Sequence, residues 1–137
     1  MDPLSITASI TALLQLSSTV VQYLGEVKSA TNDRQKILGE VVALSGLLYH
    51  LQNLVSQAQG HDEWLATMRS LGVAGGPLEH IRQSLEFLSA KLTPREGLKK
   101  VGKALSWPFQ EREIKGILEA MERQKAVISL AMQNDHM

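Results

Sequence analysis

The chain begins MDPLSITASITALLQLSSTVVQYLG, and no charged residue lies between Asp2 and Glu26. Apolar residues recur three or four positions apart, as in an amphipathic helix, and Ser17 interrupts the row formed by Ile6, Ile10, Leu13, Val20 and Leu24. A helix from Pro3 to Gly25 would be roughly 35 Å long, close to the hydrocarbon thickness of a bilayer. Nine of its residues are Ser, Thr or Gln, so the segment is only half apolar. Such a helix can pack against a bundle or enter a membrane, and the pattern leaves both open.

The rest of the chain carries the same helical period in longer stretches. A second helix is expected from about Asn32 to Gly60, with an apolar stripe at Ile37, Val41, Leu44, Leu48, Leu51 and Val55. That stripe is widened by Leu38, Val42, Leu47 and Leu54, which predicts that this helix is the central and most buried one. Further long helices are expected after Pro77 and Pro108, with apolar faces at Leu78, Ile81, Leu85, Leu88, Leu92, Ile114, Ile117, Met121, Ile128 and Ala131.

Shorter helical segments are expected between the long ones. One passes through Trp64, Leu65, Met68 and Leu71, and another follows the capping box at residues 93–96. The run GVAGGP at residues 72–77 predicts a turn, and strand patterns are absent. The sequence therefore predicts an all-α fold, an up-and-down bundle of four-helix type with short connecting helices. A single domain is expected over residues 1–137, in which 1–25 form the first helix and 26–134 the remaining bundle.

Composition narrows the class of protein. The chain is 44% hydrophobic and 20% charged, as in ordinary globular proteins, and it contains no cysteine. The lack of cysteine fits a reducing compartment, and the start has no cationic segment of the secretory type, so we expect a cytoplasmic protein with a natural N-terminus. The formal net charge is zero, which does not favour nucleic acid as a partner. The balance is uneven, because residues 1–90 carry an acidic excess and residues 91–125 a basic one.

None of the histidines, serines or glycines of the chain lies in a recognisable catalytic, metal-binding or phosphate-binding pattern. No two of the four histidines, His50, His61, His80 and His136, have the spacing of a helical metal pair. None of the serines lies in a GxSxG or SxxK motif, and the glycine-rich run lacks the Lys-Ser/Thr ending of a phosphate-binding loop. We therefore expect neither an enzyme nor a cofactor.

The opening helix is the first candidate functional site. Small residues recur at spacing four, as Ser5 and Ser9 on one diagonal and Ala8 and Ala12 on another. In lipid, such rows let helices approach closely, whereas in a soluble bundle they simply permit tight packing. As a membrane-inserting helix, the segment would use Pro3, Leu4, Ser5, Ile6, Ala8, Ser9, Ile10, Ala12, Leu13, Leu14, Leu16, Val20, Val21 and Leu24.

The second candidate is the basic segment at residues 93–109, TPREGLKKVGKALSWPF. Lys99, Lys100 and Lys103 are neighbours on a helix, and Trp107 follows them. A basic amphipathic helix next to a tryptophan is typical of a surface that contacts the headgroups of anionic lipids. The alternative is a solvated lysine face, with Trp107 filling the end of the bundle.

Three segments resemble a known family. They are the opening MDPLSITASI-x-x-LLQL, the segment ALSGLLYHLQNL, and the run LSWPFQEREIKGILEAMERQKAVISLAMQND. Together they resemble the HeLo-like domain, which opens many fungal NLR-type receptors and ankyrin-repeat proteins. The most specific matches are the start at Met1 to Ser5 and the Trp-Pro-Phe at Trp107 to Phe109.

The resemblance implies a cell-death execution or signalling module. It is also similar to the HeLo domain of fungal incompatibility proteins and to the four-helix bundle of an animal necroptosis effector. In such domains the N-terminal segment is thought to insert into the plasma membrane after oligomerisation, which would assign insertion to Pro3–Leu24. The implied partners are further copies of the chain, anionic membrane lipids, and a cognate NLR-type or amyloid-motif protein. A soluble adaptor bundle that never enters lipid remains the alternative.

Overall fold

The computed structural model describes residues 3–27, 31–57, 62–73, 75–93 and 107–134 of the 137-residue chain. These ranges form five helices and no strand, which confirms the all-α class. The helices are α1 (Pro3–Glu26), α2 (Thr31–Gln57), α3 (Asp62–Leu71), α4 (Pro77–Leu92) and α6 (Glu111–Asn134).

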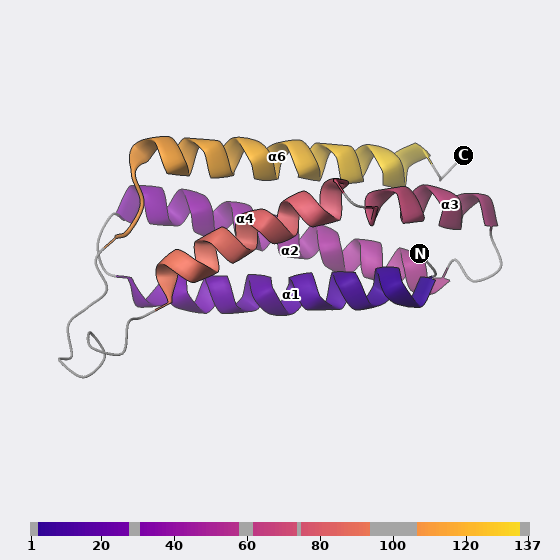
Figure 1. Ribbon diagram of the computed structural model, residues 1–137, viewed down its shortest axis with the longest axis horizontal. Coiled ribbons are helices and arrows are strands. Elements are labelled where there is room, and N and C mark those ends of the chain that lie inside the picture. Colours follow the sequence, from indigo (N-terminus) through magenta and orange to yellow (C-terminus); the bar gives the residue numbers. More distant parts are fainter. Residues whose placement is uncertain (1–2, 28–30, 58–61, 74, 94–106, 135–137) are drawn as a thin grey trace.

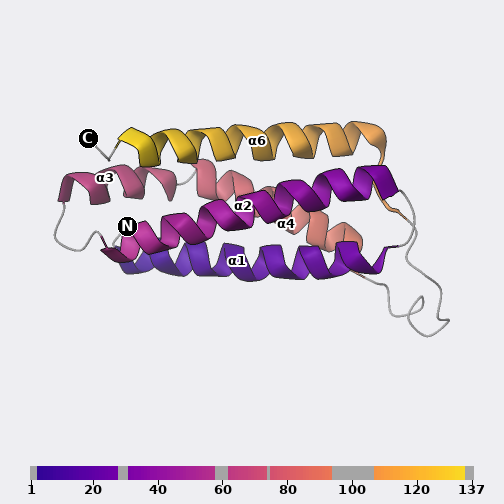
Figure 2. The same ribbon diagram turned by 180° about the vertical axis from the view of Figure 1, so that it is seen from behind.

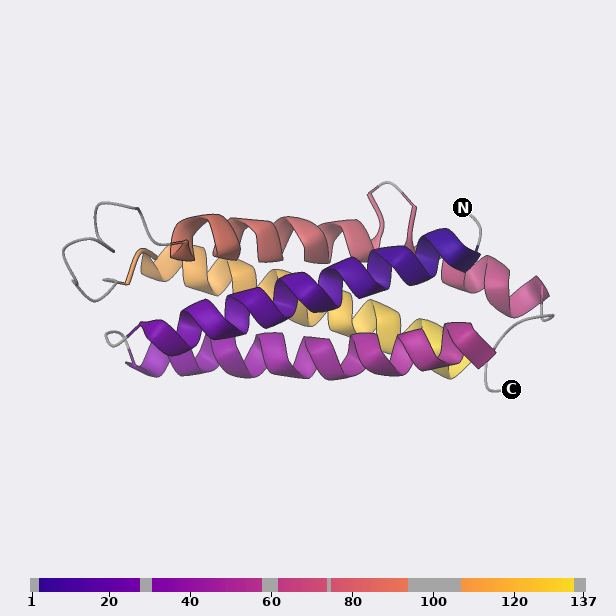
Figure 3. The ribbon, with the colours of Figure 1, turned by 90° about the horizontal axis from the view of Figure 1, so that it is seen from below.

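The four long helices α1, α2, α4 and α6 alternate in direction and form an up-and-down bundle (Figure 1). Helix α1 packs against α2 and α4, and α6 packs against the same two helices from the opposite side. Seen from below, α1 lies in front with α2 and α4 on either side and α6 behind (Figure 3). The short α3 lies at the end of the bundle where α1 begins and α6 ends, in contact with both (Figure 2).

The core is built from one seam of residues on each long helix. The buried residues of each seam follow one another at spacings of three or four, as in coiled-coil packing. On α2 the seam is Ile37, Val41, Leu44, Leu48, Leu51 and Val55, and on α4 it is Leu78, Ile81, Leu85, Leu88 and Leu92. On α6 it is Ile114, Ile117, Met121, Gln124, Ile128 and Met132, so one seam position is held by a glutamine.

The expectation of a central second helix is wrong. Each of the four long helices occupies a corner of the bundle, so α2 buries one face and exposes the other, like its neighbours. Leu38, Leu47 and Leu54 pack half-buried beside the seam, but Val42 is 53% exposed. Ala131 is half-buried and Met132 lies in the core at the end of α6.

The turn predicted at residues 72–77 connects α3 to α4. Gly75 has a φ of 76°, in the left-handed region that favours glycine. A Cβ on Gly76 would approach the carbonyl oxygen of Val73 to 2.9 Å, so the chain passes too close to itself for any other residue. Pro77 then opens α4, where its missing N–H costs no hydrogen bond. This close turn sets the start of α4 beside α3.

Candidate functional site

The apolar residues assigned to membrane insertion lie mostly inside the bundle. At most 3% of each of Ile6, Ile10, Leu13, Val20 and Leu24 is exposed, and Leu14, Leu16 and Val21 are half-buried against them. The small residues divide, because Ala8 and Ala12 face outwards whereas Ser9 is half-buried. Pro3, Leu4 and Ser5 belong to α1, with side chains outside the described part of the chain. In this structure, the apolar edge of α1 is therefore covered by protein.

Ser17 continues the buried seam of α1 where the sequence pattern indicated an interruption. Its side chain is completely buried, and its hydroxyl oxygen has no hydrogen-bond partner. Other helical hydroxyls of this chain donate to the carbonyl four residues earlier, as Thr19 Oγ1 does to Gln15 at 3.1 Å and Ser45 Oγ to Val41 at 2.9 Å. A buried hydroxyl without a partner loses its bonds to water and gains none. Ser17 thus weakens the contact between α1 and the rest of the bundle.

The outer side of α1 carries no charged residue before Glu26. It is formed by Ala8, Thr11, Ala12, Gln15, Ser18 and Gln22. A surface helix normally places charged residues opposite its apolar stripe, so this composition is unusual for an exposed helix.

The outer side of α2 continues this surface. Its exposed residues beyond Lys36 and up to Asn53 include Gly39, Val42, Ala43, Gly46, Tyr49, His50 and Asn53, and none is Lys, Arg, Asp or Glu. Two contacts fix the register of the two helices, because Gln52 Nε2 donates to Thr11 Oγ1 at 3.0 Å and Arg34 Nη1 to the Leu24 carbonyl at 3.4 Å. We refer to these exposed residues of both helices as the α1–α2 face.

Charges gather instead on the opposite half of the bundle. Helix α6 alone carries eight: Glu111, Arg112, Glu113, Lys115, Glu119, Glu122, Arg123 and Lys125. Lys125 pairs with Glu40 of α2 at 2.6 Å, and Lys91 of α4 pairs with Glu113 at 2.7 Å. The two halves of the surface therefore differ in chemistry although the chain as a whole is neutral.

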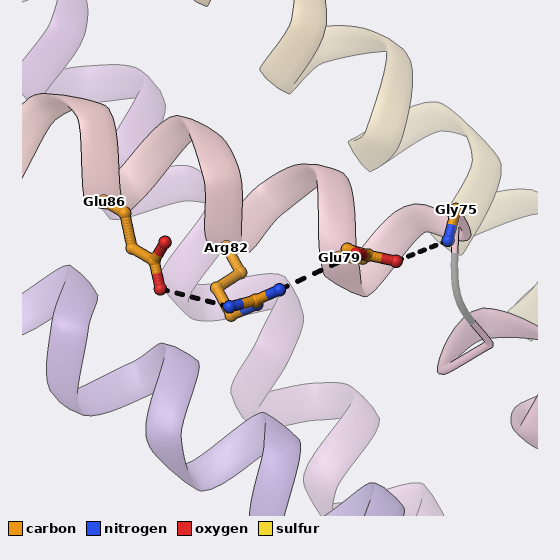
Figure 4. A network of polar contacts seen from close by, with 4 residues as sticks. All are labelled: Gly75, Glu79, Arg82 and Glu86. Carbon is orange, nitrogen blue, oxygen red and sulfur yellow. Dashed lines mark hydrogen bonds and ion pairs between the residues drawn. The ribbon is translucent and has the colours of Figure 1, made fainter.

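A groove of about 450 Å³ lies between α1 and α4. Apolar side chains, including Leu13, Leu16 and Leu78, line much of it, and Ser9 and Ala12 contribute from α1. Its charged rim comes from α4, where Arg82 lies between Glu79 at 3.7 Å and Glu86 at 3.3 Å (Figure 4). Glu79 also accepts the backbone N–H of Gly75. Arg82 is three residues from Glu79 and four from Glu86, spacings at which charged side chains of a helix meet. This network could therefore have been predicted from the sequence, but the apolar periodicity alone did not indicate it.

The three lysines proposed for headgroup contact, Lys99, Lys100 and Lys103, lie outside the described residues. Trp107 is half-buried against the core, with its ring edge-on to Phe109 at 5.0 Å between centroids. Lys91 Nζ lies 5.9 Å from the Phe109 ring centroid, within reach of a cation–π contact. Here Trp107 serves as packing at one end of the bundle.

Glu113 ties α4 to α6 beside this aromatic cluster. Its carboxylate accepts the Gln110 backbone N–H at 2.9 Å and pairs with Lys91. The backbone hydrogen bond first, and the lysine second, hold the pKa of Glu113 below its ordinary value of 4.5. Neither this ion pair nor the one between Glu40 and Lys125 was visible in the sequence, because the partners are far apart along the chain.

The described residues include neither a membrane-spanning helix nor a metal site. None of the helices there combines the length and hydropathy needed to cross a bilayer. No group of three His, Asp or Glu residues in the same ranges could hold a metal ion.

Comparison with known proteins adds no relative to this picture. No family model, curated protein or solved structure matches the chain.

Proposed function

We propose that this chain is a cell-death signalling and execution module of a cytoplasmic protein. In this proposal it self-associates on activation, moves to the plasma membrane, and engages and permeabilises it through α1. The sequence resemblance to HeLo-like domains supplies the class of function. The observation that carries the role of α1 is its combination of a covered apolar edge with an uncharged outer side.

The energetics of α1 support a switch that depends on a new contact. Its seam buries six apolar side chains, counting Val27, at about 1.5–3 kcal/mol each, or on the order of 10 kcal/mol. This is comparable to the whole free energy of unfolding of a domain, about 5–15 kcal/mol. Helix α1 therefore leaves the bundle only where another apolar environment replaces its lost contacts. Lipid and clustered copies of the chain both provide one, and clustering raises the local concentration of released helices.

The uncharged outer side of α1 lowers the cost of that transfer. Moving a Lys or Asp side chain into lipid costs about 2.5–3.5 kcal/mol at the bilayer centre, whereas α1 carries no such residue up to Gly25. Its Ser, Thr and Gln residues still need partners in lipid, which neighbouring copies of α1 in an assembly would provide. Insertion is thus expected from oligomers rather than from single chains.

The test tethers α1 to the bundle without removing it. The chain contains no cysteine, so Thr11→Cys with Gln52→Cys allows α1 to be joined to α2 by a short, reducible bis-maleimide. We expect the tethered protein to release far less dye from anionic liposomes than the same variant before cross-linking. Reduction of the cross-linker should restore the leakage.

A matched control tethers two other helices. Lys91→Cys with Glu113→Cys joins α4 to α6 and leaves α1 free to move. Leakage should persist in this control. Full leakage from the protein tethered between α1 and α2 would show that release of α1 is not required, and the assignment of α1 would then be wrong.

A soluble adaptor bundle is the second candidate. The exposed α1–α2 face favours it, because an uncharged helical surface also suits docking to another protein. Liposome flotation at low salt separates the two candidates, since an adaptor would form oligomers yet stay out of the lipid fraction. In the same assay, changing Lys99, Lys100 and Lys103 to Glu should abolish lipid binding if this cluster contacts headgroups.

A further inference from the structure

We propose that the α1–α2 face is the contact between two copies of this chain. The copies pair antiparallel about a two-fold axis that passes α2 between Val42 and Ala43. This inference specifies the surface for the self-association in the proposed function, and it can fail while membrane activity stands.

Large apolar side chains stand exposed on this face. Val42 is 53% exposed and Tyr49 is 57% exposed, and the two lie two turns apart on α2. Isolated exposed apolar residues are common on proteins, but these two share one side of one helix with no charged residue between them.

Two glycines flank Val42 on the same side of the helix. A Cβ added to Gly39 or Gly46 would meet nothing within 4 Å, so the fold of the single chain gives no packing reason for either. Glycine inside a helix is destabilising relative to alanine, and it permits close approach of a second helix. In the proposed pairing, Gly39 of one copy faces Gly46 of the other and Val42 faces Ala43. The exposed valine then fills space that the glycines leave open.

The absence of charge points to a second copy as the occupant. In a two-fold contact the same surface meets itself, so a cluster of like charges would repel its own image. The α1–α2 face avoids this repulsion, whereas the outer side of α6 carries charged residues along most of its length. A strongly charged partner would find no complementary group on the α1–α2 face.

The size of the face fits a weak dimer. Its residues cover 15 positions on each helix, Ala8 to Gln22 and Gly39 to Asn53. That is about 22 Å of helix, and two helices side by side are about 20 Å wide, giving roughly 450 Å² per copy. A pair would cover about 900 Å², which is the size of a weak, transient interface. Pairing is therefore expected to depend steeply on local concentration, as a clustering signal requires.

The first test uses a matched pair of substitutions at exposed valines. Val42→Glu places a charge in the contact, and Val127→Glu makes the same change on the outer side of α6. Sedimentation velocity of the soluble chain over a range of concentrations should show self-association weakened at least about tenfold by Val42→Glu and unchanged by Val127→Glu. Equal dissociation constants for the two variants, or a wild-type chain that stays monomeric throughout, would overturn the proposal.

A second pair tests the close approach of helices. Gly46→Leu and Gly116→Leu both add a side chain where the folded chain leaves open space. Thermal unfolding should show both variants folded, while only Gly46→Leu weakens self-association. A dimer unaffected by Gly46→Leu contradicts the pairing. So does a Val42→Glu chain that loses vesicle binding while its self-association is unchanged, since lipid would then be the occupant.

Liposome leakage separates this inference from the proposed function. If Val42→Glu leaves both self-association and leakage unchanged, the inference alone is wrong. If Val42→Glu weakens self-association but the wild-type chain releases no dye, the membrane role alone is wrong.

Discussion

Ser17 occupies a seam position that its neighbours along α1 fill with Ile, Leu or Val. From the sequence it is an interruption in an apolar row, yet the helix continues and buries the hydroxyl completely. The periodicity of the surrounding residues therefore places the Ser17 side chain in the core, where its hydroxyl has no hydrogen-bond partner and lowers the stability of the fold. A residue of this kind lowers the stability of the resting state at the helix proposed to move.

Replacing Ser17 by Ala should stabilise the folded chain by about 1 kcal/mol, because the orphaned hydroxyl disappears and alanine is the better helix former. Urea denaturation of the two proteins measures the difference. Ser45→Ala is the control, since Ser45 Oγ has a hydrogen-bond partner and its loss offsets the gain in propensity. The interpretation of Ser17 is wrong if the two alanine variants are equally stable.

At the scale of elements, the contact between α4 and α6 is held partly by a titrating group. The Gln110 N–H and Lys91 favour the charged form of Glu113, so its pKa in the folded chain lies below 4.5. Its contribution to stability is complete well above that value and is lost as the pH falls through the lowered pKa.

Glu113→Gln should therefore lower the melting temperature slightly at neutral pH, and the difference from wild type should vanish in acid, well below pH 4.5. The effect is small because the pair lies at the surface. Melting curves over a pH series provide the measurement, with Glu111→Gln as the control in the same helical turn. A difference that persists at the lowest pH would contradict the role of the ion pair.

The elements themselves were readable from the sequence, because spacings of three and four mark each seam and Pro77 marks the start of α4. What periodicity could not decide was the width of each stripe. Leu38 and Val42 looked alike, and only the corner position of α2 leaves Val42 exposed. The pairing of Glu40 with Lys125 was equally hidden, since it depends on which helices become neighbours.

At the scale of the whole molecule, the four seams form one core. Removing residues 1–26 would leave the seams of α2 and α4 uncovered where α1 now packs. We expect the truncated chain to lose its sharp unfolding transition and to bind a hydrophobic dye, as loosely packed states do. Calorimetry and dye fluorescence test this, and an added peptide of residues 1–27 should restore the transition. A truncated chain that unfolds cooperatively would show that the core does not need α1.

The ion pairs among the described residues join α2 to α6, join α4 to α6, or lie within α4, and none of them reaches α1. The seam of α1 is likewise free of titrating side chains. Among the described residues, salt and acid therefore act mainly on contacts between the other helices, and α1 is held chiefly by its apolar seam, with one hydrogen bond from a charged side chain, that of Arg34. For the residues that the structure describes, a competing apolar surface is therefore a stronger means of releasing this helix than a change in ionic strength or pH.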